Sequence, residues 1–177
     1  MADRFPGEIT IGGTLSAKLL EAFLGVVTSA GAKVGSYEGS PFDATTAEGL
    51  LEVLDENRHL FLVDDEARYG QFENLEAFCI KHNIPFDRHS SARYEFDAEK
   101  VMFRPGMKRP LGVPSNDEGG MLLNVETVRP VAKELARLAT AKMTGDKLLA
   151  GVAKASKRLT ELLPPDIEPL PPLEVVE

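Results

Sequence analysis

The sequence predicts an α+β fold in which two β–α–β-type units form one ferredoxin-like mixed sheet with helices on one face, followed by a C-terminal helical pair. Apolar runs of strand length alternate with amphipathic stretches over residues 1–106. Helical periodicity dominates residues 125–163, and turn-forming residues fill 107–124. Because one sequence does not fix strand order, a doubly wound α/β sheet is the alternative.

The first β–α–β unit covers the N-terminal forty residues. Residues 9–11 alternate as a strand does, and Ser16 is a suitable N-cap for the helix that follows. Gly31 suits the helix end, because glycine adopts the left-handed conformation readily. Residues 33–37 then predict a second strand, and Thr45 with Glu48 has the spacing of a capping box for a short helix.

The second unit begins with the apolar run of residues 60–63, which predicts a strand buried on both faces. A helix is expected from Gly70 to His82, and a further strand over residues 84–89. For such a unit the expected strand pairing is parallel. Residues 94–96 and 100–104 flank a turn and predict an antiparallel hairpin on the same sheet.

Four parts are therefore expected: an α+β domain of residues 1–106, a linker loop of 107–124, a helical pair of 125–163 and a Pro-rich extended tail of 164–177. Thr127 and Thr144 are the predicted starts of the two helices, whose narrow apolar seams suit a hairpin or a dimer interface. The tail is expected to be disordered, with addition to a sheet edge as the alternative.

Composition indicates a soluble, cytoplasmic chain. The net charge is −8, no window resembles a membrane span, and Cys79 is the single cysteine. The charge is unevenly distributed: residues 1–80 carry 14 acidic and 5 basic side chains, whereas residues 129–158 carry 8 basic and 2 acidic ones. Such segregation of charge favours binding to a protein partner or to a second copy of the chain, and binding to nucleic acid is also possible. It gives no reason to expect a membrane or a cofactor.

Basic side chains are the candidate binding residues. Some are interleaved with aromatic residues on the predicted hairpin, as single-stranded nucleic acid would require, and others follow one flank of the last helix. The candidates are Arg88, Arg93, Arg104, Lys147, Lys154, Lys157 and Arg158.

Asp64, Asp65 and Glu66 follow the buried strand and offer oxygen ligands for a divalent cation. Neighbouring residues of an extended chain point in opposite directions, however, so no metal site is assigned. His89 beside Ser90 lacks the context of a known catalytic motif.

The favoured function is therefore a non-enzymatic interaction or scaffold protein that uses the basic helices and the tail. A nucleic-acid-associated accessory protein is the first alternative, and a metal-dependent hydrolase or phosphoryl-transfer enzyme at Asp64–Glu66 is the second.

Overall fold

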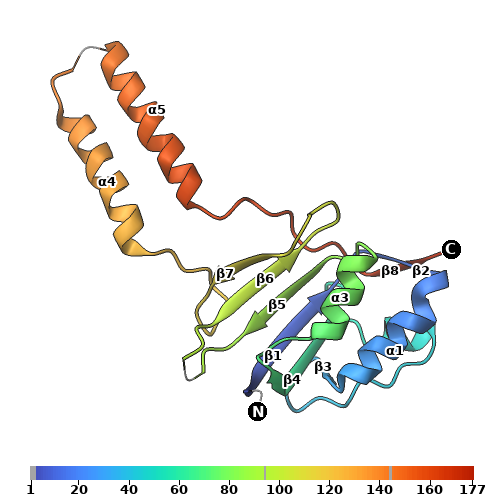
Figure 1. The fold of residues 1–177 in the computed structure, drawn as a ribbon. Helices are drawn as coiled ribbons and strands as arrows, with labels where there is room; N and C mark the ends of the chain where they lie inside the picture. The colour runs from blue at the N-terminus through green and yellow to red at the C-terminus, as the bar shows by residue number, and fades with distance from the viewer. Residues whose placement is uncertain (1–2, 94, 144) are drawn as a thin grey trace. The chain divides into compact units, whose positions relative to one another are not determined.

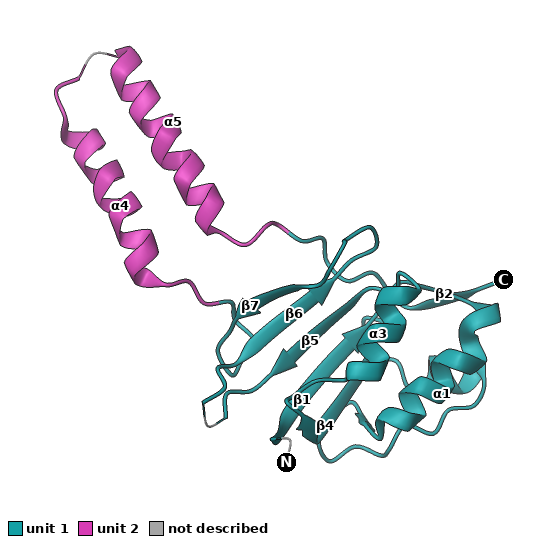
Figure 2. Cartoon of the chain, in the orientation of Figure 1, with its two compact units in different colours: residues 1–121, 167–177 teal, residues 122–166 magenta. Residues whose placement is uncertain are grey.

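The computed structural model describes residues 3–93, 95–143 and 145–177, which divide into two compact units (Figure 2). The sheet unit combines residues 1–121 with residues 167–177, and the helical unit comprises residues 122–166. The C-terminal tail therefore belongs to the same unit as the N-terminal strands.

A six-stranded antiparallel sheet forms the centre of the sheet unit (Figure 1). Each neighbouring pair in this sheet is antiparallel, so both the predicted mixed sheet and the doubly wound alternative are wrong. In spatial order its strands are β3 (Lys33–Val34), β4 (Leu60–Arg68), β1 (Arg4–Ile11), β5 (Phe86–Ser90), β6 (Glu99–Phe103) and β7 (Leu111–Pro114).

Strands β4 and β5 do not pair with each other, contrary to the prediction for the second β–α–β unit. Strand β1 lies between them and is antiparallel to both, with Ile9 opposite Leu62 on one side and Arg88 on the other. Strands β4 and β5 consequently run in the same direction without direct contact. The inserted strand comes from the far N-terminal end of the chain, which no local pattern around residues 60–90 could reveal.

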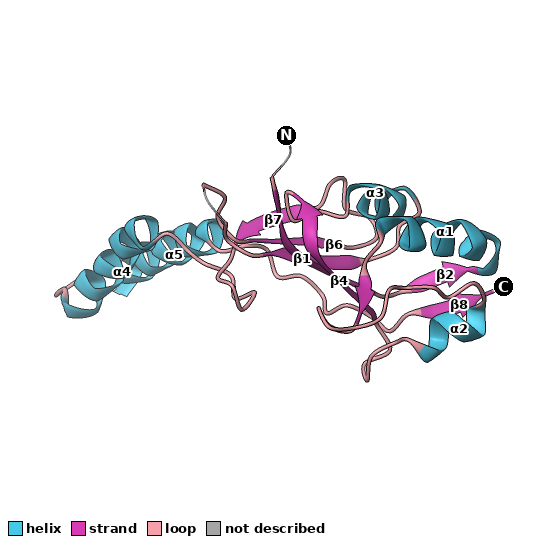
Figure 3. Ribbon diagram, turned by 90° about the horizontal axis from the view of Figure 1, so that it is seen from below, coloured by secondary structure: helices cyan, strands magenta, loops and turns pink. Residues whose placement is uncertain are grey.

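Helices α1 (Leu20–Ala30) and α3 (Glu73–Lys81) lie together on one side of the sheet (Figure 3). The predicted caps of the first helical segment are confirmed. Ser16 accepts a hydrogen bond from the Lys18 amide before the short 3₁₀ turn η1 (Ala17–Leu19), and Gly31 ends α1 with φ of 69°. Thr46, rather than Thr45, caps α2 (Ala47–Glu52) by accepting from the Gly49 amide at 3.1 Å.

The main core lies between the sheet and these two helices. The inward-facing side chains of alternate strand positions meet the apolar stripes of α1 and α3, and each fully buried aliphatic or aromatic side chain contributes about 1.5–3 kcal/mol. The central members are Ile9, Ile11, Leu60, Leu62, Phe86 and Phe103 from the sheet, with Phe23, Val27, Leu75 and Cys79 from the helices.

Two strands occur where loops or disorder were expected. Strand β7 lies inside the predicted linker and pairs with β6, while β8 (Glu174–Val176) pairs in parallel with β2 (Thr14–Ser16). The tail is thus ordered, and Leu173 is fully buried in the core. The predicted hairpin strand of residues 94–96 includes residue 94, which lies outside the described residues.

The helical unit consists of α4 (Val125–Thr140) and α5 (Gly145–Leu162), which run side by side in Figures 1 and 2. Asn124, not Thr127, caps α4, because its side chain accepts from the Glu126 amide at 2.8 Å. The predicted start of the second helix, Thr144, lies outside the described residues. No helix in the described part of the chain is both long enough and apolar enough to cross a membrane.

Candidate functional site

The predicted basic residues do not form one site. Arg88, Arg93 and Arg104 belong to the sheet unit, whereas the other four, Lys147, Lys154, Lys157 and Arg158, lie on α5. Arg104 has a structural role: its guanidinium donates to Asp87 Oδ1 at 2.7 Å and to the Glu168 carbonyl at 2.8 Å, which holds the C-terminal tail.

Arg88, one of the predicted binding residues, is buried in the sheet unit. Its side chain is 3% exposed and lies between two carboxylates. One terminal nitrogen donates to Glu99 Oε2 at 2.7 Å, and the other donates to the Gly70 carbonyl at 3.2 Å. Nε lies 3.0 Å from Glu76 Oε1 as an ion pair, without the alignment of a hydrogen bond. Arg88 therefore links β5, β6, the turn before α3 and the first turn of α3.

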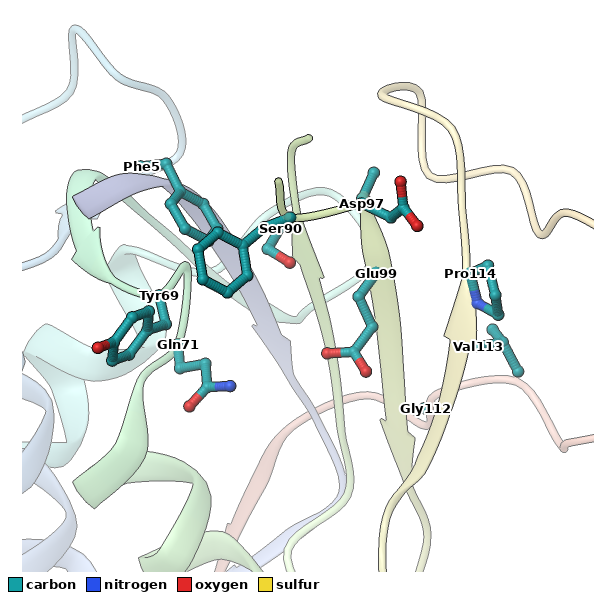
Figure 4. Close-up of a pocket in the computed structure, with 11 residues that line it drawn as sticks. Phe5, Tyr69, Gln71, Ser90, Asp97, Glu99, Gly112, Val113 and Pro114 are labelled. Atoms are coloured by element: carbon teal, nitrogen blue, oxygen red, sulfur yellow. The ribbon is translucent and has the colours of Figure 1, made fainter. Parts of the chain in front are cut away.

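A cavity of about 650 Å³ lies next to this ion-pair network (Figure 4). Strand register explains its position: Ser90 on β5 is opposite Glu99 on β6, and Glu99 is opposite Pro114 on β7. The cavity opens on the face of the sheet to which Arg88 and Ser90 point. Its lining residues are Phe5, Tyr69, Gln71, Ser90, Phe96, Asp97, Ala98, Glu99, Gly112, Val113 and Pro114.

Aromatic rings form one wall of this cavity, and carboxylates form part of the other. The Phe96 ring centroid lies 5.6 Å from that of Phe5 and 5.8 Å from that of Tyr69. In Figure 4 the side chains of Glu99 and Gln71 extend into the same space. A Cβ atom on Gly112 would lie 2.8 Å from Glu99 Oε1, so glycine leaves room for that carboxylate.

This cavity was not predicted from the sequence. Tyr94 and Phe96 were expected to pack beneath the helices, but Phe96 is half-buried at the cavity wall, and residue 94 lies outside the described part. The strand that completes the cavity, β7, was predicted to be loop. Its proline at position 114 obscured the pattern, although proline is tolerated at the end of an edge strand.

The acidic cluster is not a loop but the middle of β4. Asp65 Oδ2 pairs with Lys33 Nζ at 2.9 Å, and Asp64 Oδ1 accepts from the Glu66 amide at 2.9 Å. The Asp64 and Asp65 carboxylates therefore make separate contacts. Among residues 3–93, 95–143 and 145–177, no group of three or more His, Cys, Asp or Glu side chains is arranged to hold a metal ion.

His89 and Ser90 do not form a catalytic pair. Ser90 lines the cavity, whereas His89 lies on the opposite face of the strand, with Nε2 3.0 Å from the Asn116 carbonyl oxygen.

Two further side chains have raised pKa values. Burial, followed by the nearby negative charge of Glu8, raises the pKa of the Tyr37 hydroxyl, which donates a hydrogen bond to that carboxylate. Burial, followed by the proximity of Glu76, raises the pKa of the Cys79 thiol to about 12, so Cys79 is a poor nucleophile.

The helical unit has two contrasting faces. Arg158 pairs with Glu134 at 2.8 Å and joins α5 to α4 along one flank, where Lys147 and Lys154 also lie by their spacing of seven and four residues. Leu149 and Val152, three residues apart on the opposite flank of α5, are 69% and 41% exposed.

The opposite flank of α4 must lie on the same side as Leu149 and Val152, because the Glu134–Arg158 pair fixes which flanks adjoin. Eight positions along these two flanks carry uncharged side chains, and the charged Arg129 and Asp146 lie at the border, within one helical turn of them. We call this surface the apolar face; it consists of Val125, Val128, Ala132 and Ala139 on α4 and Leu149, Val152, Ser156 and Leu163 at and just after α5.

Comparisons with protein-family models, with curated proteins and with solved structures gave no significant match.

Proposed function

We propose that this chain is a non-enzymatic interaction protein of the cytosol that binds a second copy of itself through the apolar face of its helical unit. The observation that carries the proposal is the composition of this face, which lacks charged side chains and leaves large apolar ones exposed. Val125 and Leu149 are among the most exposed apolar side chains in the described part of the chain.

The helical unit has a small core of its own. Its buried side chains, within the described residues, are Val131, Leu138 and Ala155. Gly151 allows close approach of the helices, since a Cβ there would lie 2.7 Å from a Leu138 methyl carbon. Two helices with so small a core gain stability when a second pair covers them, as in four-helix bundles.

A second copy suits the apolar face better than an arbitrary partner does. The basic side chains Lys147, Lys154 and Arg158 occupy the opposite flank, so two copies joined at their apolar faces keep like charges apart. The same patch would meet itself across a two-fold axis, as isologous dimers require.

Sedimentation equilibrium of designed variants tests this proposal. Leu149→Asp places a charge in the proposed interface and should weaken dimerisation by on the order of 100-fold, since an apolar side chain is lost from each copy. Ala150→Asp is the matched control, because Ala150 is exposed on α5 away from the apolar face and the charge change is the same. Equal masses for Leu149→Asp, Ala150→Asp and the unaltered chain would refute the proposed interface.

In this proposal the sheet unit is the scaffold. The order β3-β4-β1-β5 supports a ferredoxin-like arrangement, in which two β–α–β units interleave and alternate strands run antiparallel. Strands β6 and β7 would then be an extension of that scaffold at one edge.

A second candidate function is a nucleic-acid-associated accessory protein. The exposed flank with Lys147, Lys154, Lys157 and Arg158 favours it, because cations at this spacing can follow phosphates. Fluorescence anisotropy with labelled single-stranded RNA at 50–200 mM salt provides the test. Lys154→Glu with Lys157→Glu should abolish binding, while Lys81→Glu with Lys108→Glu in the sheet unit, which makes the same charge change, should not.

A further inference from the structure

The cavity beside Arg88 has the chemistry of a ligand site that is independent of the helical unit. Its volume of about 650 Å³ falls within the range of small-molecule sites. Of the lining residues, all of which the structure describes, none is Lys, Arg or His, whereas Asp97 and Glu99 are both present. Aromatic rings and two carboxylates, of which Glu99 is paired with Arg88 behind the cavity, therefore face the same space.

We propose that this cavity binds an organic cation, namely an ammonium or guanidinium group attached to an apolar body. The cationic end would interact with Glu99 and Asp97, and the apolar body would contact the rings of Phe5, Tyr69 and Phe96. This proposal does not depend on self-association.

Charge in and behind the cavity favours a cation. Arg88 is shared between Glu76 and Glu99, so the three groups together retain one negative charge, and the exposed Asp97 adds another. An anionic ligand would meet these carboxylates without a lining cation to compensate, which disfavours it.

The position of Glu99 is fixed before any ligand arrives. Arg88 donates to Oε2 of this carboxylate, whereas Oε1 lies on the side of Gly112. Its side chain is 44% exposed, so it can accept a further hydrogen bond. A carboxylate held in this way loses little conformational freedom when it binds an N–H donor.

The aromatic wall also suits a cation. The faces of aromatic rings attract cations, as the Tyr69 ring does the Arg68 guanidinium, whose carbon lies 5.6 Å from the ring centroid. A ligand cation would therefore use the rings of Phe5 and Phe96 or the other face of Tyr69. The clustered rings of Phe5 and Phe96 provide apolar surface beside it. Such a ligand could be a free small molecule or a Lys or Arg side chain of another protein, and these two sources share the same chemistry.

Isothermal titration calorimetry of the full chain with three probes tests the proposal. Phenethylamine represents a free aromatic amine, the capped tripeptide Gly-Arg-Gly represents a protein side chain, and phenylacetate carries the opposite charge on a similar body. Binding of either cation without binding of phenylacetate is the expected result, and the tighter of the two cations identifies the source. Absence of binding by both cations, or equal binding of phenylacetate, would overturn the proposal.

Variants then locate the site. Asp97→Asn should weaken binding of the cation by about three- to tenfold, in the range of partly exposed charge and cation–π interactions. Glu95→Gln makes the same charge change two residues away, outside the lining, and should leave binding unaltered. Equal weakening by both variants would indicate only a general effect of net charge and would reject the site. Asp97 is preferable to Glu99 for this test, because Glu99→Gln would also remove an ion pair from the buried Arg88.

Discussion

Arg88 illustrates how one buried charge organises its surroundings. Its guanidinium is held by Glu76 on α3 and Glu99 on β6, and it also donates to the Gly70 carbonyl. The Glu76 carboxylate in turn accepts from the Phe72 amide at 2.9 Å, just before α3 begins. Removing the arginine would therefore leave a buried acceptor and two carboxylates without their cation.

The first prediction concerns the stability that this network provides. We expect Arg88→Ala to lower the free energy of unfolding by about 3 kcal/mol, the usual cost of breaking a buried ion pair from one side. Urea denaturation followed by circular dichroism measures it. Arg109→Ala, at an exposed position, should change stability by less than about 0.5 kcal/mol. Similar losses for the two variants would contradict the structural role of Arg88.

The second prediction concerns the Cys79 thiol, whose pKa burial raises from 9.0 to about 12. Between these values the unfolded chain loses this proton and the folded chain keeps it, so stability falls as pH rises. The contribution of one such group has a slope of about 1.4 kcal/mol per pH unit.

Urea denaturation at several values between pH 8.5 and 10.5 checks this prediction. Cys79→Ala should give a shallower loss of stability with pH than the unaltered chain, whatever its stability at pH 7. Tyr37, whose pKa is also raised, will contribute to the remaining slope at the alkaline end. Parallel curves for the two proteins would show that the thiol does not titrate differently in the folded state.

At the scale of elements, the C-terminal tail is held by backbone contacts that no side-chain pattern encodes. The Gly13 amide donates to the Pro171 carbonyl at 2.9 Å, and the Glu174 amide donates to the Gly13 carbonyl at 2.8 Å. Gly12 permits this approach, because a Cβ there would lie 2.0 Å from the Pro171 oxygen. The turn between β1 and β2 therefore requires glycine for packing.

The third prediction follows from that close approach. Gly12→Ala should displace the tail and reduce the hydrogen-exchange protection of the Leu173 and Glu174 amides at least tenfold. Gly25→Ala is the control: no heavy atom lies within 4 Å of the added carbon, and alanine stabilises a helix interior by about 0.5–1 kcal/mol. Unchanged protection of the tail in Gly12→Ala would mean that the tail is not seated on this turn.

Local elements were largely predictable from the sequence, whereas their long-range partners were not. The central apolar run of β4, the helix from Glu73 to Lys81 and the cap at Gly31 follow from periodicity and turn chemistry. Strand β7 was missed, and a strand in the tail was predicted only as the alternative to disorder, because both strands are short and lie beside prolines. Their partners β6 and β2 supply the pairing that their own sequences do not indicate.

The candidate site was predictable only in its residue types. Arg88 was identified as functional because it is basic and lies near aromatic residues, but the sequence could not show that Glu76 and Glu99 would enclose it. The cavity needs β1, β5, β6 and β7 side by side, together with the turn after β4. Phe5 and the turn after β4 lie far along the chain from residues 90–114, which supply the rest of the lining, so the site has no spacing that could be recognised in the sequence.

At the scale of the whole molecule, the two units divide the chemistry between them. The sheet unit has an extensive core and a preformed cavity, and the helical unit has a small core, a basic flank and the uncharged apolar face. An exposed surface of this kind is costly in water unless another surface covers it. We therefore expect self-association through the apolar face to dominate the behaviour of the full chain in solution.

The most direct measurement is the mass of the full chain by sedimentation equilibrium, from about 1 to 100 µM protein, at low and high salt. We expect the mass to rise with concentration from 19.3 kDa to twice that value. High salt should leave this association intact, because the interface is apolar. A mass that stays at 19.3 kDa throughout, or an association that disappears at high salt, would contradict this expectation.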